Sequence, residues 1–149
     1  MPDNPIQIKC LDHVVLRVRD VSRAISFYED VMGCAVERRI DEIGLVQLRA
    51  GASLIDLVGV DTPLGRAGGS EPSLATKNVD HFALTLEGFD NDAIRSHLER
   101  HDIESGDPAT RYGAEGFGPS LYIKDPDGNT VELKGPPEAP DERDSKADD

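Results

Sequence analysis

An internal repeat limits the folds that this chain can adopt. The segment Leu11–Val18, which reads LDHVVLRV, is echoed by Val79–Leu86, which reads VDHFALTL. In both segments apolar residues recur at alternate positions, which is typical of a β-strand. A helical pattern of apolar residues follows each one, at Val21–Met32 and at 91–101. The sequence therefore predicts two modules of similar structure.

Each module is expected to continue with further strands. The first contains three more apolar runs of strand length, at Cys34–Ile40, Gly44–Ala50 and Leu54–Val58. This order predicts a β-α-β-β-β module. The second contains two clear runs, Ser120–Lys124 and Asn129–Lys134, joined by an Asp-Pro-Asp-Gly turn. Around Ile103 and Thr110 its pattern is undecided.

The repeat also predicts how the chain is divided. We expect one domain over 9–135, made of a first module (9–60), a linker rich in glycine and proline (61–77) and a second module (78–135). Residues 1–8 form an N-terminal extension. From Glu138 to Asp149 there are six acidic and two basic residues, so 136–149 is expected to be a disordered acidic tail.

Charge excludes several classes of partner. The 149 residues include 29 Asp and Glu against 16 Lys and Arg, a formal net charge of −13. Binding to nucleic acid or to an anionic membrane surface needs clustered positive charge, so neither is expected. The apolar runs are too short for a transmembrane helix, and no secretion signal is visible at the start. With two cysteines and no zinc-type spacing, the expected location is the cytoplasm.

Strand alternation predicts which side chains share a face of the sheet. One face is apolar in both modules. The other carries polar residues, namely His13, Gln47, Asp56, His81, Tyr122 and Glu132. Two imidazoles and two carboxylates at matched positions of the repeat form a complete ligand set for a divalent first-row metal. An ordinary solvated face explains the same pattern equally well, so the residues alone leave both interpretations open.

Several motifs together resemble the vicinal oxygen chelate superfamily, which includes glyoxalase I, bleomycin and fosfomycin resistance proteins, extradiol dioxygenases and methylmalonyl-CoA epimerase. The resemblance covers Lys9–Gly135 and rests on the two Asp-His pairs, the segment Ala24–Tyr28 before Gly33, and the segment Tyr122–Leu133. It implies an α+β fold of two tandem βαβββ modules that form a curved mixed sheet around a metal-binding cavity.

The resemblance also implies a metal site and catalytic groups. Carried over by position, the metal ligands are His13, Asp56, His81 and Glu132, with Glu132 as catalytic base and Asp56 as its opposite partner. Asp56 departs from the family pattern, where glutamate or glutamine is usual. Because aspartate is one methylene shorter, it either binds through water or leaves more open coordination positions. One divalent ion per site is implied, either nickel, zinc, iron or manganese.

The length of the folded part resembles the short bacterial glyoxalases. That resemblance implies a lyase or isomerase, of the lactoylglutathione lyase type, that moves a proton next to a metal-chelated carbonyl of a small oxygenated substrate or its thiol adduct. It also implies a homodimer. A bleomycin- or fosfomycin-type resistance or sequestering protein is the alternative. Ring-cleaving dioxygenase chemistry is disfavoured because 113–115 lacks the histidine expected there.

Other side chains are candidates for contacts with the substrate. Cationic, amide and phenolic groups suit an anionic or oxygen-rich ligand, and the candidates are Arg17, Gln47, Arg111 and Tyr122. The glycine-rich stretch Tyr112–Pro119 is either a mobile lid or a loop with special backbone angles.

Overall fold

The computed structural model describes residues 5, 7–69, 71–73 and 76–138, and divides the chain into two compact units, Met1–Glu71 and Pro72–Asp149. We call these unit 1 and unit 2. The division falls inside the range 61–77 that the sequence analysis treats as a linker. Most of the predicted acidic tail, from 139 onward, lies outside the described residues.

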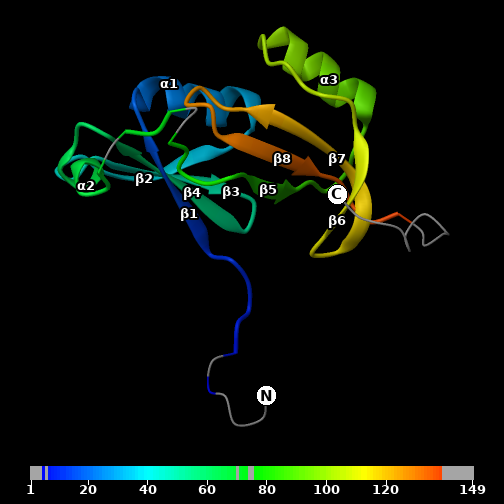
Figure 1. The fold of residues 1–149 in the computed structure, drawn as a ribbon, viewed down its shortest axis with the longest axis horizontal. Helices are drawn as coiled ribbons and strands as arrows, with labels where there is room; N and C mark the ends of the chain where they lie inside the picture. The colour runs from blue at the N-terminus through cyan, green and yellow to red at the C-terminus, as the bar shows by residue number, and fades with distance from the viewer. Residues whose placement is uncertain (1–4, 6, 70, 74–75, 139–149) are drawn as a thin grey trace. The chain divides into compact units, whose positions relative to one another are not determined.

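Unit 1 is a four-stranded mixed sheet with a helix between its first two strands (Figure 1). The strand order is β1-β4-β3-β2, with β1 parallel to β4 and the other neighbours antiparallel. The elements in chain order are β1 (His13–Val18), α1 (Val21–Ser26), η1 (Phe27–Val31), β2 (Ala35–Ile40), β3 (Leu45–Ala50), β4 (Ser53–Gly59) and α2 (Pro63–Arg66).

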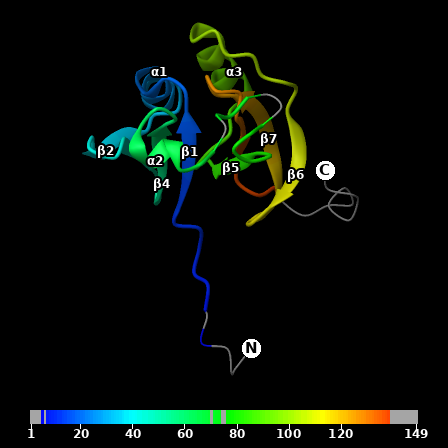
Figure 2. The same cartoon turned by 60° about the vertical axis from the view of Figure 1, so that its left-hand side comes forward.

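Unit 2 repeats this topology, as Figure 2 shows from a second direction. Its strand order is β5-β8-β7-β6, with β5 parallel to β8. The elements are β5 (Phe82–Thr85), α3 (Asn91–Arg100), β6 (Ala109–Gly113), β7 (Gly116–Lys124) and β8 (Thr130–Lys134). Both units are therefore βαβββ modules, and the predicted α+β fold of two such modules is confirmed.

The apolar face of each sheet forms the core of its unit. In unit 1, Leu16 on β1 pairs with Leu57 on β4, and both are fully buried. In unit 2, Leu121 on β7 pairs with Leu133 on β8, and both are buried. Removing such side chains from water is the main favourable contribution to folding. The opposite face of each sheet is thereby left for polar residues.

The helix that follows the first strand of each unit, α1 or α3, begins at an aspartate. The side chain of Asp20 accepts a hydrogen bond from the backbone N–H of Arg23 (3.1 Å), and Asp90 accepts one from Ala93 (3.1 Å). Such N-caps satisfy one of the backbone donors that a helix start leaves unpaired. The repeat thus includes the signal that starts the helix.

Two predicted elements differ in the structure. The first helix is not regular up to Met32, because Phe27–Val31 forms a π-helical turn in which the N–H of Met32 donates to the carbonyl of Phe27 (3.3 Å). This wider turn buries both Phe27 and Tyr28, whose rings meet edge to face with centroids 5.0 Å apart. The stretch Tyr112–Pro119 is a β-hairpin between β6 and β7, not an irregular loop.

No helix in the described part of the chain is long and apolar enough to cross a membrane.

Candidate functional site

In unit 1 the side chain of His13 faces a buried carboxylate. His13 begins β1, and Asp56 lies on the adjacent central strand β4. The His13 Nε2 atom is 4.0 Å from Asp56 Oδ2, and the Asp56 side chain is only 4% exposed. On the other side of the ring, His13 Nδ1 is 2.7 Å from Asp12 Oδ2. Because a carboxylate can only accept, Nδ1 carries the proton and Nε2 faces Asp56.

A row of polar side chains continues from Asp56 across the sheet. Gln47 is paired with Asp56 in the strand register, and its Nε2 donates to Asp56 Oδ2 (3.1 Å). Its amide oxygen accepts from Arg38 Nη1 (3.1 Å), which sets the orientation of the amide. The second oxygen of Asp56, Oδ1, is buried and has no hydrogen-bond partner among the residues that the structure describes. An unpaired buried carboxylate oxygen is costly unless a ligand completes it.

Unit 2 presents the same arrangement with a longer acid. His81 Nδ1 is 2.7 Å from Asp80 Oδ2, and His81 Nε2 is 3.5 Å from Glu132 Oε1. Glu132 lies on the central strand β8 and is 7% exposed. Tyr122, its register partner on β7, meets the His81 ring edge to face with centroids 5.6 Å apart. Tyr122 thus limits the orientations of the imidazole that faces Glu132.

The remaining predicted substrate contacts lie in different places. Arg111 on β6 is stacked over Tyr122, with its guanidinium carbon 4.3 Å from the ring centroid. Arg17 on β1 donates from Nη1 to the carbonyl oxygen of Gly69 (3.0 Å), which ties β1 to the segment after α2. The structure therefore gathers Gln47 with the first histidine–carboxylate pair and Arg111 with the second, while Arg17 has a separate partner.

The protonation of each pair follows from these contacts. The pKa of His13 is raised above its usual value, because Asp12 accepts its hydrogen bond and Asp56 attracts the imidazolium charge. In unit 2 the hydrogen bond from His81 and the charge of its ring lower the pKa of Asp80.

The two pairs fit a divalent cation by their donor chemistry. When its imidazole is neutral and the proton is on Nδ1, each histidine directs the lone pair of Nε2 toward the carboxylate, and a cation bound between the two acceptors would satisfy both. Two ligands that each bind a first-row ion at about 2.0–2.2 Å are at most about 4.3 Å apart, so both separations allow it. Within the residues that the structure describes, no three His, Cys, Asp or Glu side chains gather as a complete metal site.

Sequence reasoning assigned no role to several residues around the two pairs. Asp12 and Asp80 hold the histidine rings, and the repeated Asp-His dipeptide was a visible signal for them. Arg38 reaches Gln47 because a β-bulge between Val36 and Arg38 shifts the register of β2, so Arg38 comes onto the polar face. Regular alternation would have placed Arg38 on the apolar face, and no signal in the sequence shows the bulge.

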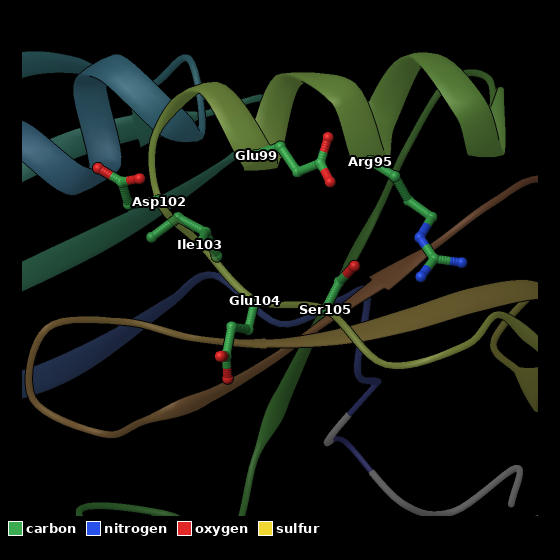
Figure 3. A pocket seen from close by; sticks show the side chains of 6 residues that line it. All are labelled: Arg95, Glu99, Asp102, Ile103, Glu104 and Ser105. Atoms are coloured by element: carbon green, nitrogen blue, oxygen red, sulfur yellow. The ribbon is translucent and has the colours of Figure 1, made fainter.

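One cavity in unit 2 lies apart from these residues. It has a volume of about 610 Å³ and is lined by the end of α3 and the segment that follows it. Figure 3 shows Arg95 and Glu99 on α3, and Ile103, Glu104 and Ser105 on the segment that follows the helix. None of the predicted metal or substrate residues lines this cavity.

With this geometry established, comparison with known proteins defines the family. Residues 10–133 match the model of the Glyoxalase/Bleomycin resistance protein/Dioxygenase superfamily. The chain therefore belongs to this superfamily. It is 32% identical over 124 residues to the virulence protein STM3117 of Salmonella typhimurium, covering 83% of this chain and 81% of that protein. The crystal structure of that protein superposes with a TM-score of 0.67, covering 89% of this chain and all of that chain, at 28% identity.

More distant structures share the fold. The fosfomycin resistance protein FosX from Listeria monocytogenes, solved with Mn(II) and sulfate, has a TM-score of 0.64 at 18% identity, covering 88% of this chain and 93% of that chain. Lactoylglutathione lyase from Agrobacterium tumefaciens has a TM-score of 0.60 at 21% identity, covering 89% of this chain and 96% of that chain.

Proposed function

We propose that this protein is a divalent-metal-dependent enzyme of the glyoxalase type. It would act as a lyase or isomerase that moves a proton next to a carbonyl of a small oxygenated substrate or its thiol adduct. The observation that carries the proposal is the pair of histidines whose Nε2 atoms face buried carboxylates, at 4.0 Å from Asp56 and 3.5 Å from Glu132. Family membership supports the reaction class.

The proposed metal ligands are His13, Asp56, His81 and Glu132. The unpaired Oδ1 of Asp56 supports direct ligation by this shorter side chain, because a cation would complete the buried oxygen. We propose that both pairs bind the same ion, and this proposal rests on family membership alone. When bound, nickel, zinc, iron or manganese would act as a Lewis acid toward the substrate oxygens.

The two carboxylates differ in a way that supports their proposed roles. Asp56 is held by the amide of Gln47, whereas in the described part of the chain no side chain donates a hydrogen bond to Glu132, which faces His81 Nε2 at 3.5 Å. The lone pairs of Glu132 are therefore available to accept a proton from the substrate. We propose Glu132 as the catalytic base and Asp56 as its opposite partner.

Metal binding is the first test of this function. Calorimetric titration of metal-free protein with nickel, zinc, iron and manganese should show about one ion per chain, because four ligands neutralise and hold it. The variant His81→Ala should lose this binding, while His101→Ala, which removes an exposed histidine of the same unit, should not. Glyoxalase activity of the metal-loaded protein is then measured with methylglyoxal and glutathione, and Glu132→Gln should lose it.

The outcomes separate the enzyme from a sequestering protein. Absence of metal binding with all four ions would contradict the enzyme proposal. Tight binding of an aromatic drug by the metal-free protein would then favour sequestration. We also propose a homodimer located in the cytoplasm, with a small-molecule substrate and no nucleic acid or membrane as partner. Light scattering of the same preparation measures the oligomeric state.

A further inference from the structure

Gln47 lies between an arginine and the buried carboxylate of the first histidine–carboxylate pair. Its Oε1 accepts a hydrogen bond from Arg38 Nη1, and its Nε2 donates one to Asp56 Oδ2, both at 3.1 Å. Because a guanidinium carries only donors, the amide atom that faces Arg38 must be the oxygen. The amide nitrogen is therefore the atom turned toward Asp56. Both ends of the amide are thus bound by protein side chains.

The amide of Gln47 holds one oxygen of Asp56 and leaves the other available. Oδ2 accepts the hydrogen bond and lies 4.0 Å from His13 Nε2, whereas the buried Oδ1 has no hydrogen-bond partner among the described residues. The torsion that rotates a carboxylate is soft, so an unheld carboxylate samples a wide range of orientations. The hydrogen bond from Gln47 narrows this range. A contact of this kind orients a carboxylate that binds a metal.

A β-bulge brings Arg38 to the polar face of unit 1. The register of β2 against β3 shifts between Val36 and Arg38, so Glu37 is the residue without a partner in the pairing. Glu37 instead accepts two hydrogen bonds of 2.9 Å from the guanidinium of Arg49 on β3. This bidentate ion pair fastens the bulge to the neighbouring strand. The bulge in turn directs Arg38 at Gln47.

The corresponding position of unit 2 shows what the amide adds. Glu132 is paired in the register with Tyr122, as Asp56 is with Gln47. The longer acid lies 3.5 Å from His81 Nε2, and within the described residues no side chain donates a hydrogen bond to it. Of the two described acids, the shorter one is therefore the one held by an amide.

From these contacts we infer that Arg38 and Gln47 are positioning residues for the metal ligand Asp56. Arg38 fixes the orientation of the Gln47 amide, and the amide fixes the carboxylate. The inference rests on the proposed function, because it concerns the ion that Asp56 would hold. It gives Gln47 a role in place of the substrate contact that the sequence analysis expects, and it assigns one to Arg38.

The amide itself is measured first, by NMR of the metal-free protein. Gln7 and Gln47 are the two glutamines of the sequence, so a Gln47→Met variant identifies the side-chain amide signals of Gln47. Arg38→Met should shift these signals and speed the exchange of the amide protons with water, because the partner of Oε1 is lost. Arg39→Met is the matched control. It removes the next arginine of β2, which pairs with Asp41, and should leave the signals unchanged.

Metal affinity then tests the positioning role. Metal-free protein is titrated calorimetrically with whichever of nickel, zinc, iron and manganese the wild type binds most tightly. Arg38→Met and Gln47→Met should each weaken binding about tenfold or more, as is typical for residues that orient a ligand. The double variant should bind no more weakly than Gln47→Met, because Arg38 acts through the amide. Arg39→Met should bind like the wild type. Because Arg38 is exposed, its replacement should leave unit 1 folded.

The outcomes separate this inference from the proposed function. A wild type that binds none of the four ions would refute the metal enzyme, and the positioning role with it. If the wild type binds metal and either single variant binds it equally tightly, the positioning role is overturned while the metal site stands. Unchanged Gln47 signals in Arg38→Met would also overturn it. So would losses that add in the double variant, because these would show two independent effects.

Discussion

At the scale of single residues, the preceding aspartate determines which nitrogen of each histidine is free. In both units the aspartate carboxylate lies 2.7 Å from Nδ1 of the histidine that follows it. The proton is thereby held on Nδ1, and Nε2 is directed at the buried acid. Such a carboxylate partner behind a histidine is the arrangement that orients metal-binding imidazoles. The repeated dipeptide is therefore more informative than the histidine alone.

This contact predicts a pH dependence that NMR can measure. In metal-free protein His13 should titrate above 6.5, and Asp12→Asn should lower its pKa, because the main cause of the raised pKa is removed. A raised folded-state pKa adds stability that is fully present below the unfolded pKa and is lost as pH rises through the folded pKa. Asp12→Asn should therefore be less stable than wild type at about pH 5.5 and equal to it well above the folded pKa.

Histidine ring titration and urea unfolding at the two pH values provide the measurement. Asp41→Asn is the matched control, since it removes an exposed aspartate of unit 1 that pairs with Arg39. It should leave the pKa of His13 unchanged. An unaltered His13 pKa in Asp12→Asn would show that the hydrogen bond does not hold in solution.

Residue-level prediction succeeded where strand alternation applies and failed where the backbone departs from it. The polar face containing Gln47 and Asp56 follows from side chains that alternate along regular strands, and the register pairs these two residues. Arg38 was missed because one extra residue in β2 reverses the faces beyond it.

At the scale of elements, close backbone contacts position α2 against the end of β4. The N–H of Gly65 donates to Thr62 Oγ1 (3.3 Å), and the Thr62 hydroxyl donates to the Gly59 carbonyl (2.6 Å). A Cβ atom at position 65 would overlap the Gly59 carbonyl oxygen. The helix can approach the strand this closely only because position 65 has no side chain.

Gly65→Ala therefore tests the packing of α2. Alanine is the better helix former by about 1 kcal/mol, which alone would stabilise the protein. The overlap with a backbone oxygen outweighs this gain, and we expect a net loss of about 1–3 kcal/mol in the free energy of unfolding. Urea denaturation measures the difference. Gly106→Ala is the control, because a Cβ there meets no atom within 4 Å; equal stability of the two variants would contradict the contact.

At the scale of the whole molecule, the repeat in the sequence corresponds to a repeat in the structure. The orders β1-β4-β3-β2 and β5-β8-β7-β6 are the same arrangement of four strands used twice. Each unit contains a histidine at or directly before the start of its first strand, and this histidine faces a carboxylate on the parallel neighbouring strand. Sequence periodicity could predict both modules because each is built from local patterns. It could not show how many ions the two pairs bind, since that depends on contacts between residues far apart in the chain.

The number of ions per chain distinguishes the two ways in which the pairs could work. If both pairs bind one ion, the wild type binds one per chain, and His13→Ala and His81→Ala each abolish tight binding, because either loss leaves an incomplete ligand set. If each pair bound its own ion, the wild type would bind two, and each variant would retain one. The shared ion is our expectation, since two ligands alone hold a first-row metal weakly. Metal content after dialysis, measured for the wild type, both variants and His101→Ala, separates these cases, and a variant that keeps one tightly bound ion would refute the shared site.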